Sequence, residues 1–278
     1  MRILGIETSC DETAAAVVDD GRLVRSNVVA SQIPIHERFG GVVPEIASRQ
    51  HVLVIDSVVE LALAHACYDL SAIDAVAVTY GPGLSGPLLV GTTFAKGLAL
   101  GYGLPLLAVN HIEGHVLSVW LSMDTNPAPV PELPMVALVA SGGHTELVLV
   151  TAPGTNRILG QTVDDAAGEA FDKVGRLLGL PYPGGPSVEA VAETIGDRDG
   201  VPDLPRAWLP GTLNFSFSGL KTAMVRAVHA REHEDSGPLK SPVVARMASS
   251  FQESVADVLT RKLVDAVTGS GAVSASIV

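Results

Sequence analysis

Two histidines four residues apart are the side chains of this sequence best suited to bind a metal ion. His111 and His115 open a segment with helical spacing, and positions i and i+4 of a helix lie on one face. Both imidazoles can therefore reach one ion, although a pair of capping or core histidines gives the same pattern. Glu113 does not directly follow His111, so the order differs from the His-Glu-x-x-His of zinc peptidases. Two ligands also leave a catalytic site incomplete, because such sites usually take about three protein ligands.

Two polar turns offer groups that bind phosphate or metal ions. The turn Ser141–Thr145 contains two glycines, and backbone amides in a glycine-rich turn can hold a phosphate. An ordinary hairpin turn explains it equally. A matching turn near the N-terminus contains Ser9, Asp11 and Glu12, whose hydroxyl and carboxylate groups suit a phosphate or metal loop. A solvated hairpin loop is the alternative for this segment.

Acidic residues gather around a predicted helix start in the second half of the chain. Asp164 and Asp165 are explained by the favourable interaction of acids with the helix dipole. Asp172 lies further inside the helix, where its carboxylate could accept hydrogen bonds from ribose hydroxyls. The rigid turn Pro183–Pro186 contains two glycines that allow a ligand to approach the backbone. Lys221 could bind phosphate, or it is an ordinary solvated lysine.

The elements that must position these residues begin with a β-meander. Its three strands precede an alternation of helices and strands, which predicts a mixed sheet with helical crossovers. We expect strands at Met1–Thr8, Ala14–Val18, Leu23–Ala30, Ile73–Thr79 and Leu106–Val109, and helices at Pro44–Ala66, Leu88–Leu100 and His111–Leu121. The apolar face of the helix from Ile46 to Ala66 suits either the core or a docking surface, and we favour the core.

The second half repeats the opening order of apolar strand, polar turn and apolar strand. The proline-rich segment 124–134 is the predicted linker between the two halves. After it we expect strands at Met135–Ala140, Thr145–Thr151, Leu213–Ser218 and Ala272–Val278, the last one buried, and helices at Ala166–Leu178, Ser187–Ile195, Leu220–Val228 and Val243–Thr268. The sequence therefore predicts two topologically related lobes, residues 1–123 and 135–278.

Composition limits the class of protein and its partners. The chain has 278 residues, 47% of them apolar, which suits two domains with sizeable cores. A formal net charge of −12 disfavours generic nucleic-acid binding, so any RNA contact needs a local basic patch or partner proteins. Two cysteines do not make a disulfide framework, which favours a reducing compartment. The uncharged segment Ala75–Ala95 contains two prolines and is expected to fold as strand, loop and helix rather than a membrane span.

Seven motifs, in order along the chain, resemble those of one enzyme family. They are Glu7–Thr13, Gly40–Glu45, Gly81–Leu84, His111–His115, Ser141–Thr145, Gly168–Lys173 and Phe215–Lys221. The family is the tRNA N6-adenosine threonylcarbamoyltransferases, formerly called O-sialoglycoprotein endopeptidases. The resemblance implies an α/β actin-like, sugar-kinase-like ATPase fold with two related ribonuclease-H-like lobes. The second lobe is expected to be incomplete, because the family pattern continues beyond Val278. It is also expected to carry a helical insertion.

The resemblance also implies a reaction and its components. The threonylcarbamoyl group of threonylcarbamoyl-AMP is transferred to N6 of the adenosine 3′ of the anticodon, in tRNAs that read ANN codons. One divalent metal ion per subunit is expected, Fe²⁺ first and Zn²⁺ second. Implied partners are tRNA, a paralogous actin-like subunit and a small ATPase subunit, in the cytoplasm and without a membrane.

Individual positions match the functional residues of the family. His111 and His115 match its metal-binding pair, whose further carboxylate ligand is expected beyond Val278, and no general base is assigned. The positions that match its substrate- or nucleotide-binding residues are Val139, Ala140, Ser141, Gly142, Gly143, Asp172 and Gly185. Two alternatives stay open, a non-catalytic actin-like scaffold subunit of the same complex and a metallopeptidase.

Overall fold

The computed structural model describes residues 1–123, 130–195, 203–235 and 239–278. The chain divides into two compact units, Met1–Val130 and Pro131–Val278. Residues 124–129 of the predicted linker lie outside the described residues, and the lobe bounds 1–123 and 135–278 remain a prediction. In the described ranges, no helix combines the length and the apolar character that crossing a membrane requires.

Unit 1 is built on a mixed five-stranded sheet of order β3-β2-β1-β4-β5. Its strands are β1 (Arg2–Glu7), β2 (Glu12–Asp19), β3 (Leu23–Ser31), β4 (Ala75–Gly81) and β5 (Leu106–Asn110). The first three form an antiparallel meander, while β4 pairs in parallel with both β1 and β5. The predicted meander with helical crossovers is therefore confirmed.

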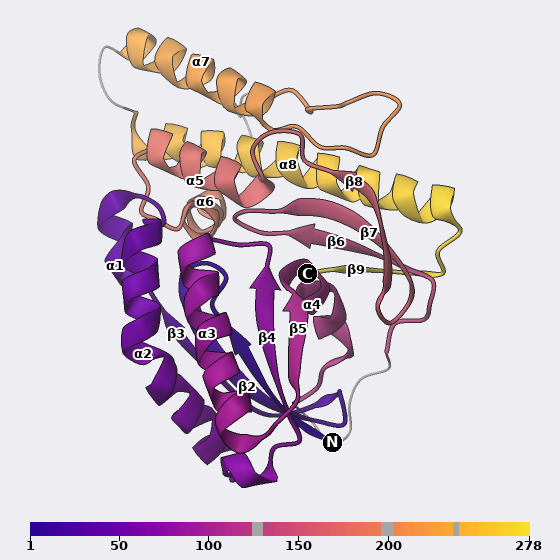
Figure 1. Ribbon diagram of the computed structural model, residues 1–278. Helices are drawn as coiled ribbons and strands as arrows, with labels where there is room; N and C mark the ends of the chain where they lie inside the picture. Colours follow the sequence, from indigo (N-terminus) through magenta and orange to yellow (C-terminus); the bar gives the residue numbers. More distant parts are fainter. Residues whose placement is uncertain (124–129, 196–202, 236–238) are drawn as a thin grey trace. The chain divides into compact units, whose positions relative to one another are not determined.

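Helices α2 and α3 pack side by side on one face of this sheet (Figure 1). The helices of unit 1 are α1 (Ile33–His36), α2 (Pro44–His65), α3 (Ser85–Tyr102) and α4 (His111–Leu117). Pro44 occupies the first turn of α2, where its missing N–H costs nothing. Ile55, Val59 and Ala62 of α2 are buried against Leu4 and Val17 of the sheet. The expected core role of α2 is thus confirmed, although Val52 and Leu53 remain 62% and 70% exposed.

Unit 2 repeats the start of this strand order in its own sheet, β8-β7-β6-β9. Its strands are β6 (Met135–Ala140), β7 (Thr145–Ala152), β8 (Thr155–Gln161) and β9 (Ser274–Ile277). As in unit 1, the first three are antiparallel neighbours and the fourth runs parallel to the first. This repeated order is that of ribonuclease-H-like sheets, and it confirms the predicted α/β, actin-like fold class.

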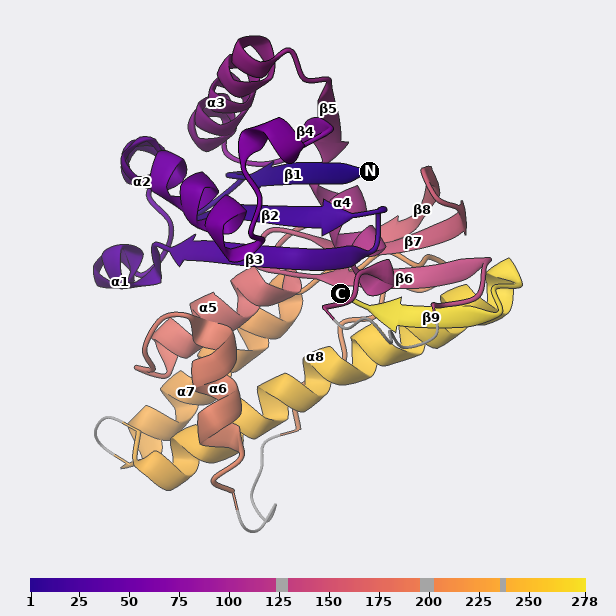
Figure 2. The same cartoon turned by 90° about the horizontal axis from the view of Figure 1, so that it is seen from below.

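In the described part of unit 2, the remaining structure is four helices around a core that contains three aromatic residues. They are α5 (Ala167–Leu177), α6 (Gly184–Ala192), α7 (Ser218–Asp235) and α8 (Ser241–Ser270). The side chains of Phe215, Phe217 and Phe251 are fully buried among them. Figure 2 shows the long helix α8 leading into β9, which brings the end of the chain into the sheet beside β6.

Two predicted features of unit 2 were wrong, and one of its strands was not predicted. Leu213–Ser218 is not a strand, because only Phe215 makes a bridge, to Thr162, while its aromatic side chains are buried. Strand β8 was not expected, since its outward residues are polar and exposed at the sheet edge. The last strand is not buried, because its residues alternate in exposure and Ile277 is 66% exposed.

Candidate active site

Strand β5 ends directly at the predicted histidine pair. The Asn110 side chain accepts hydrogen bonds from Ile112 N at 2.9 Å and Glu113 N at 3.2 Å, and so caps the start of α4. His111 and His115 therefore stand on one face, with their Nε2 atoms 3.2 Å apart. Two nitrogens bound at ~2.0–2.1 Å to one tetrahedral ion lie about 3.3 Å apart, so this separation fits a shared metal ion.

Glu7 orients the first histidine from the end of β1. Its Oε2 lies 3.3 Å from His111 Nδ1 and accepts a hydrogen bond of 2.5 Å from the Thr79 hydroxyl. Burial acts to raise the pKa of Glu7, but hydrogen bonds with His111, Ser9 and Thr79 outweigh it and lower the pKa to about 2. The ionised carboxylate favours a proton on Nδ1, which leaves the Nε2 lone pair of His111 for a metal ion.

The surroundings of His115 favour the neutral imidazole that a metal ligand needs. Burial lowers the pKa of His115, and the neighbouring His111 lowers it further. Since metal ions bind the neutral imidazole, this shift favours ligation. Among the described residues, however, no group of three or more His, Cys, Asp or Glu side chains is arranged to hold an ion. The described part of the chain thus supplies a two-histidine pair that fits a metal, with Glu7 behind it.

The predicted polar turn between β1 and β2 reaches the histidine pair through Ser9. Ser9 is buried, and its hydroxyl lies 3.2 Å from His111 Nδ1. Asp11 is half-buried and Glu12 is exposed at the start of β2. Partial burial and the charges of Asp11 and Glu7 raise the pKa of Glu12. Such a gathering of carboxylates favours a cation, or a phosphate carried by a cation, over a bare phosphate.

In unit 2, the glycine-rich turn packs against the start of α5. Gly168 N donates to Ser141 O at 3.1 Å, and Ala167 N donates to the Thr145 hydroxyl at 2.8 Å. A side chain at Gly168 would place its Cβ 2.6 Å from Ser141 O, so glycine is required for this close approach. Within the described residues, the backbone N–H groups of Gly142 and Gly143 donate no hydrogen bond. Both amides can therefore serve a ligand.

The other predicted binding positions of unit 2 divide between strand and helices. Val139 is fully buried and Ala140 half-buried at the end of β6, so these positions offer backbone rather than side chain. Asp172 Oδ1 accepts a hydrogen bond of 2.7 Å from Gly184 N and so caps α6. Gly185, next in the chain, has open space where a side chain would stand. Asp172 and Gly185 thus meet at one helix start, where the dipole favours an anion.

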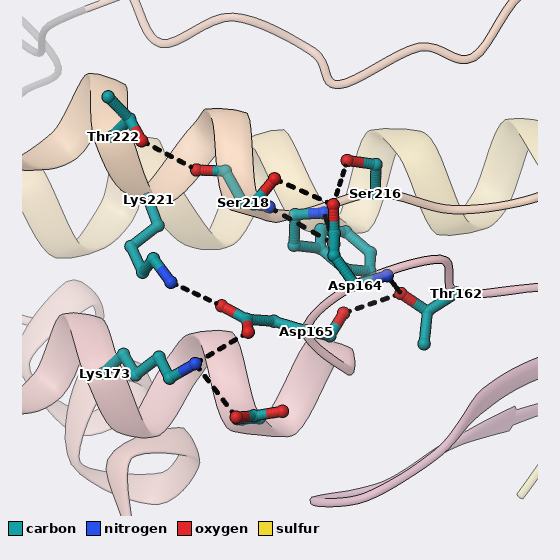
Figure 3. A network of polar contacts seen from close by, with 10 residues as sticks. Thr162, Asp164, Asp165, Lys173, Ser216, Ser218, Lys221 and Thr222 are labelled. Atoms are coloured by element: carbon teal, nitrogen blue, oxygen red, sulfur yellow. Dashed lines mark hydrogen bonds and ion pairs between the residues drawn. The ribbon is translucent and has the colours of Figure 1, made fainter.

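A network of acids and lysines joins the loop before α5 to α7 (Figure 3). Asp165 binds Lys173 at 2.6 Å and Lys221 at 2.8 Å. Asp164 accepts hydrogen bonds from Phe217 N at 2.7 Å and from the Ser218 hydroxyl at 2.8 Å. Lys221 is therefore engaged in an ion pair with Asp165 and is not an ordinary solvated lysine.

The sequence analysis assigned no role at the histidine pair to two residues that lie beside it, although Glu7 opens the first of the seven motifs. Glu7 and Thr79 lie in apolar strands, and only their side-chain hydrogen bonds show their relation to His111. The available signal was Glu7 itself, an acid that follows the apolar residues Ile3–Ile6 of the N-terminal segment. A buried charge in a strand requires a partner, and here the partner comes from a distant part of the chain.

Comparisons with known proteins agree with one another. Residues 23–278 match the family described as TsaD, tRNA N6-adenosine threonylcarbamoyltransferase. The tRNA N6-adenosine threonylcarbamoyltransferase of Thermomicrobium roseum is 51% identical over 288 residues, covering 98% of this chain and 78% of that protein. The protein of the same name from Geobacter sp. (strain M21) is 54% identical over 272 residues, covering 98% of this chain and 76% of that protein.

Solved structures resemble the chain more distantly. Component A of the (R)-2-hydroxyglutaryl-CoA dehydratase of Acidaminococcus fermentans has a TM-score of 0.48 and 11% identity. The similarity covers 99% of this chain and 92% of that one.

Proposed function

The chain belongs to the tRNA N6-adenosine threonylcarbamoyltransferase family, and from this premise we propose that the residues described above serve its transfer reaction, those of unit 1 in binding a metal ion and those of unit 2 in binding the nucleotide. The reaction transfers the threonylcarbamoyl group from threonylcarbamoyl-AMP to N6 of the adenosine 3′ of the anticodon, in tRNAs that read ANN codons. The carbonyl carbon loses its bond to the phosphate oxygen, and AMP leaves. The observation that carries the site assignment is the pair of Nε2 atoms, His111 and His115, 3.2 Å apart.

The histidine pair is the proposed metal site of this metal-dependent enzyme. Fe²⁺ is the proposed ion and Zn²⁺ the second choice, since imidazole nitrogen suits both. A bound ion supplies Lewis-acid chemistry toward oxygens of the transferred group or its phosphate. Glu7 fixes the ring of His111, and Ser9 contacts the same ring. Asp11 and Glu12, which follow Ser9 in the turn, are proposed as further polar groups for an ion or an ion-bound phosphate.

The positions of unit 2 are proposed to hold the nucleotide substrate. The free amides of Gly142 and Gly143 suit phosphate oxygens, and Val139, Ala140 and Ser141 fix the backbone around them. Asp172 and Gly185 are proposed to receive the adenylate at the start of α6, where helix amides and an acid suit phosphate and ribose. Holding substrate in this way supplies rate enhancement by positioning alone.

The proposed protein partners are a paralogous actin-like subunit and a small ATPase subunit. A groove of about 440 Å³ between α2 and α3 supports docking of the first. Apolar side chains dominate its lining, among them Val52 and Leu89, which are 62% and 67% exposed. Exposed apolar surface of this kind marks interaction sites. We also propose that the protein works in the cytoplasm, where its tRNA substrate is found; Cys10 and Cys67 are both free thiols.

The test is the double substitution of both histidines by alanine. Purified enzyme with its partner proteins should form the modified nucleoside in tRNA, quantified by mass spectrometry of nucleoside digests. The double variant should form none and should bind no zinc in equilibrium dialysis, because both nitrogen ligands are gone. His65→Ala, an exposed histidine of α2, is the matched control. Undiminished modification by the double variant would refute the metal role and favour the scaffold alternative.

The metallopeptidase alternative has no support in this family. The order around His111 lacks the directly adjacent Glu of zinc peptidases, and the relatives are transferases. The scaffold alternative is disfavoured because both histidines are present in a geometry that fits an ion.

A further inference from the structure

The turn between β1 and β2 is held from behind at three consecutive carbonyl groups. Leu84 N donates to Ser9 O at 2.8 Å, His51 Nε2 to Cys10 O at 3.0 Å, and Gln32 N to Asp11 O at 3.1 Å. The donors come from the start of α3, from α2 and from the segment before α1. Because three elements hold three successive peptide groups, the backbone of this turn has little freedom.

Two of these donors are backbone amides, and the third is the side chain of His51, which is fully buried. Its other ring nitrogen, Nδ1, lies 2.7 Å from the Thr13 hydroxyl of β2. Since Nε2 donates to Cys10 O, Nδ1 carries the lone pair and accepts from Thr13. Burial lowers the pKa of His51, which keeps this neutral tautomer at neutral pH. One imidazole thus connects α2, the turn and the following strand.

A second buried histidine supports the same turn one layer further out. His36 Nε2 lies 3.1 Å from Gln32 Oε1, and Val43 N donates to His36 Nδ1 at 3.3 Å. Gln32 and His36 are both buried. The residue that holds the Asp11 carbonyl is therefore itself tied to the start of α2.

The held turn carries one group, the Ser9 hydroxyl, that contacts the histidine pair. Ser9 N donates to the Glu7 carboxylate, and the Ser9 hydroxyl lies 3.2 Å from His111 Nδ1. Gly83 approaches Ser9 so closely that a side chain there would place its Cβ 2.6 Å from Ser9 O. A displacement of the Cys10 peptide would therefore move Ser9 relative to Gly83 and change the distance from the Ser9 hydroxyl to His111 Nδ1.

We propose that His51 is a positioning residue for threonylcarbamoyl transfer, which holds the Cys10 carbonyl so that the turn keeps Ser9 at its distance from His111 and keeps Asp11 and Glu12 in place beside it. The inference rests on the role proposed above for these three residues. His51 itself is buried and contacts no substrate. It acts through one hydrogen bond to the backbone of the turn and one to Thr13.

Two substitutions at this position separate the hydrogen bonds from packing. His51→Leu keeps the burial of the side chain and removes both hydrogen bonds, whereas His51→Gln keeps an amide donor and an acceptor. Displacing a catalytic group by about 1 Å can cost about 100-fold in rate. We therefore expect His51→Leu to lower kcat about 10- to 100-fold, with KM for tRNA within about twofold of wild type. His51→Gln should restore most of kcat.

Val59→Ala is the matched control for loss of stability. Val59 is buried in the core face of the same helix and has no part in the turn. It should lower the unfolding temperature and leave kcat unchanged. Assays are run on the complete enzyme with its partners, at a temperature where every variant is folded by circular dichroism.

The outcomes distinguish this inference from the function on which it rests. Wild-type kcat in His51→Leu, or equal impairment of the Leu and Gln variants, would overturn the positioning role. Asp11→Asn and Glu12→Gln test the turn itself. If both keep wild-type kcat, the proposed role of the turn fails and the His51 inference fails with it. If they lose activity while His51→Leu does not, only the His51 inference fails.

Discussion

Glu7 is the residue that orients the ring of His111 for the proposed metal ion. It lies at the end of β1, accepts hydrogen bonds from Thr79 and Ser9, and contacts His111 Nδ1 at 3.3 Å. Carboxylates in this relation to a histidine ligand typically contribute a factor of about 10 to 100 to metal affinity. Glu7→Gln should therefore weaken Zn²⁺ binding by about that factor, measured by competition with a chromophoric chelator.

The control for this substitution is Glu60→Gln, which neutralises an exposed acid of α2. It should leave the zinc affinity unchanged, because it removes the same charge far from the pair. Equal zinc affinities of the Glu7→Gln variant and the wild type would contradict the orienting role of Glu7.

His51 makes the stability of unit 1 depend on pH in a defined direction. Burial lowers its pKa below the ordinary 6.5, and His36 adds to this, while the Cys10 carbonyl and the charges of Glu7 and Asp11 oppose it. The unfolded chain therefore binds a proton more readily than the folded one. Stability is full above about pH 6.5 and is lost as the pH falls, by at most about 1.4 kcal/mol per pH unit.

His51→Gln removes this titration and should flatten the profile. Urea unfolding of both proteins between pH 7.5 and 5 measures it. The wild type should lose stability relative to the variant as the pH falls. A difference between the two that is constant over this range would show that His51 titrates alike in both states.

Asp164 stabilises α7 from outside the helix. Its carboxylate accepts hydrogen bonds from Phe217 N and Ser218 N and from the hydroxyls of Ser216 and Ser218. Burial acts to raise the pKa of Asp164, but these hydrogen bonds lower it on balance. Removing a capping side chain typically costs ~0.5–2 kcal/mol. Asp164→Ala should lower the free energy of unfolding by about that amount in guanidinium titrations.

Glu189→Ala, an exposed acid of α6, provides the comparison for Asp164. Its free energy of unfolding should stay within about 0.5 kcal/mol of wild type. An Asp164→Ala variant as stable as this control would mean that water replaces the carboxylate at no cost.

Elements with a clear apolar period were predictable, and those fixed by long-range contacts were not. The strands β1, β6 and β7 and the helix α2 were expected within a few residues of their observed bounds. Strand β8 was missed because an exposed edge strand needs no apolar alternation. The segment around Phe215 resembled a strand because aromatic and polar residues alternate in its sequence. In the structure both aromatic side chains are buried, but they pack among helices rather than on a sheet.

The same distinction applies to the candidate site. The spacing of His111 and His115 predicts a shared helical face, which is a local property, and the structure has it. The contacts of Glu7 and Thr79 with His111 depend on the pairing of β4 with both β1 and β5, which a local pattern does not contain. His51 was counted only as part of an apolar helix.

At the scale of the whole molecule, the groove between α2 and α3 is the proposed docking surface for the actin-like partner. Leu89 lies in the groove between α2 and α3 and is 67% exposed. A lysine there puts a charge into an apolar contact, so Leu89→Lys should weaken binding of the actin-like partner about tenfold or more. Isothermal titration with that partner measures the effect.

Leu100→Lys is the matched control on the same helix. Leu100 is 87% exposed and lies outside the groove lining, so its substitution should leave the partner affinity unchanged. If both variants lose affinity alike, general charge repulsion explains the loss. If neither does, the partner binds elsewhere.

Helix α2 contacts the turn between β1 and β2 through one face and lines the proposed docking groove with another, so binding at these two places can be thermodynamically linked. His51 on one face holds the turn, and Val52 on the other lines the groove. If a bound partner shifts the position of α2, it changes the affinity with which the turn binds its proposed ion or ion-bound phosphate. Linkage requires that the ligand change the partner's affinity by the same factor, so a filled active site and an assembled complex report on each other.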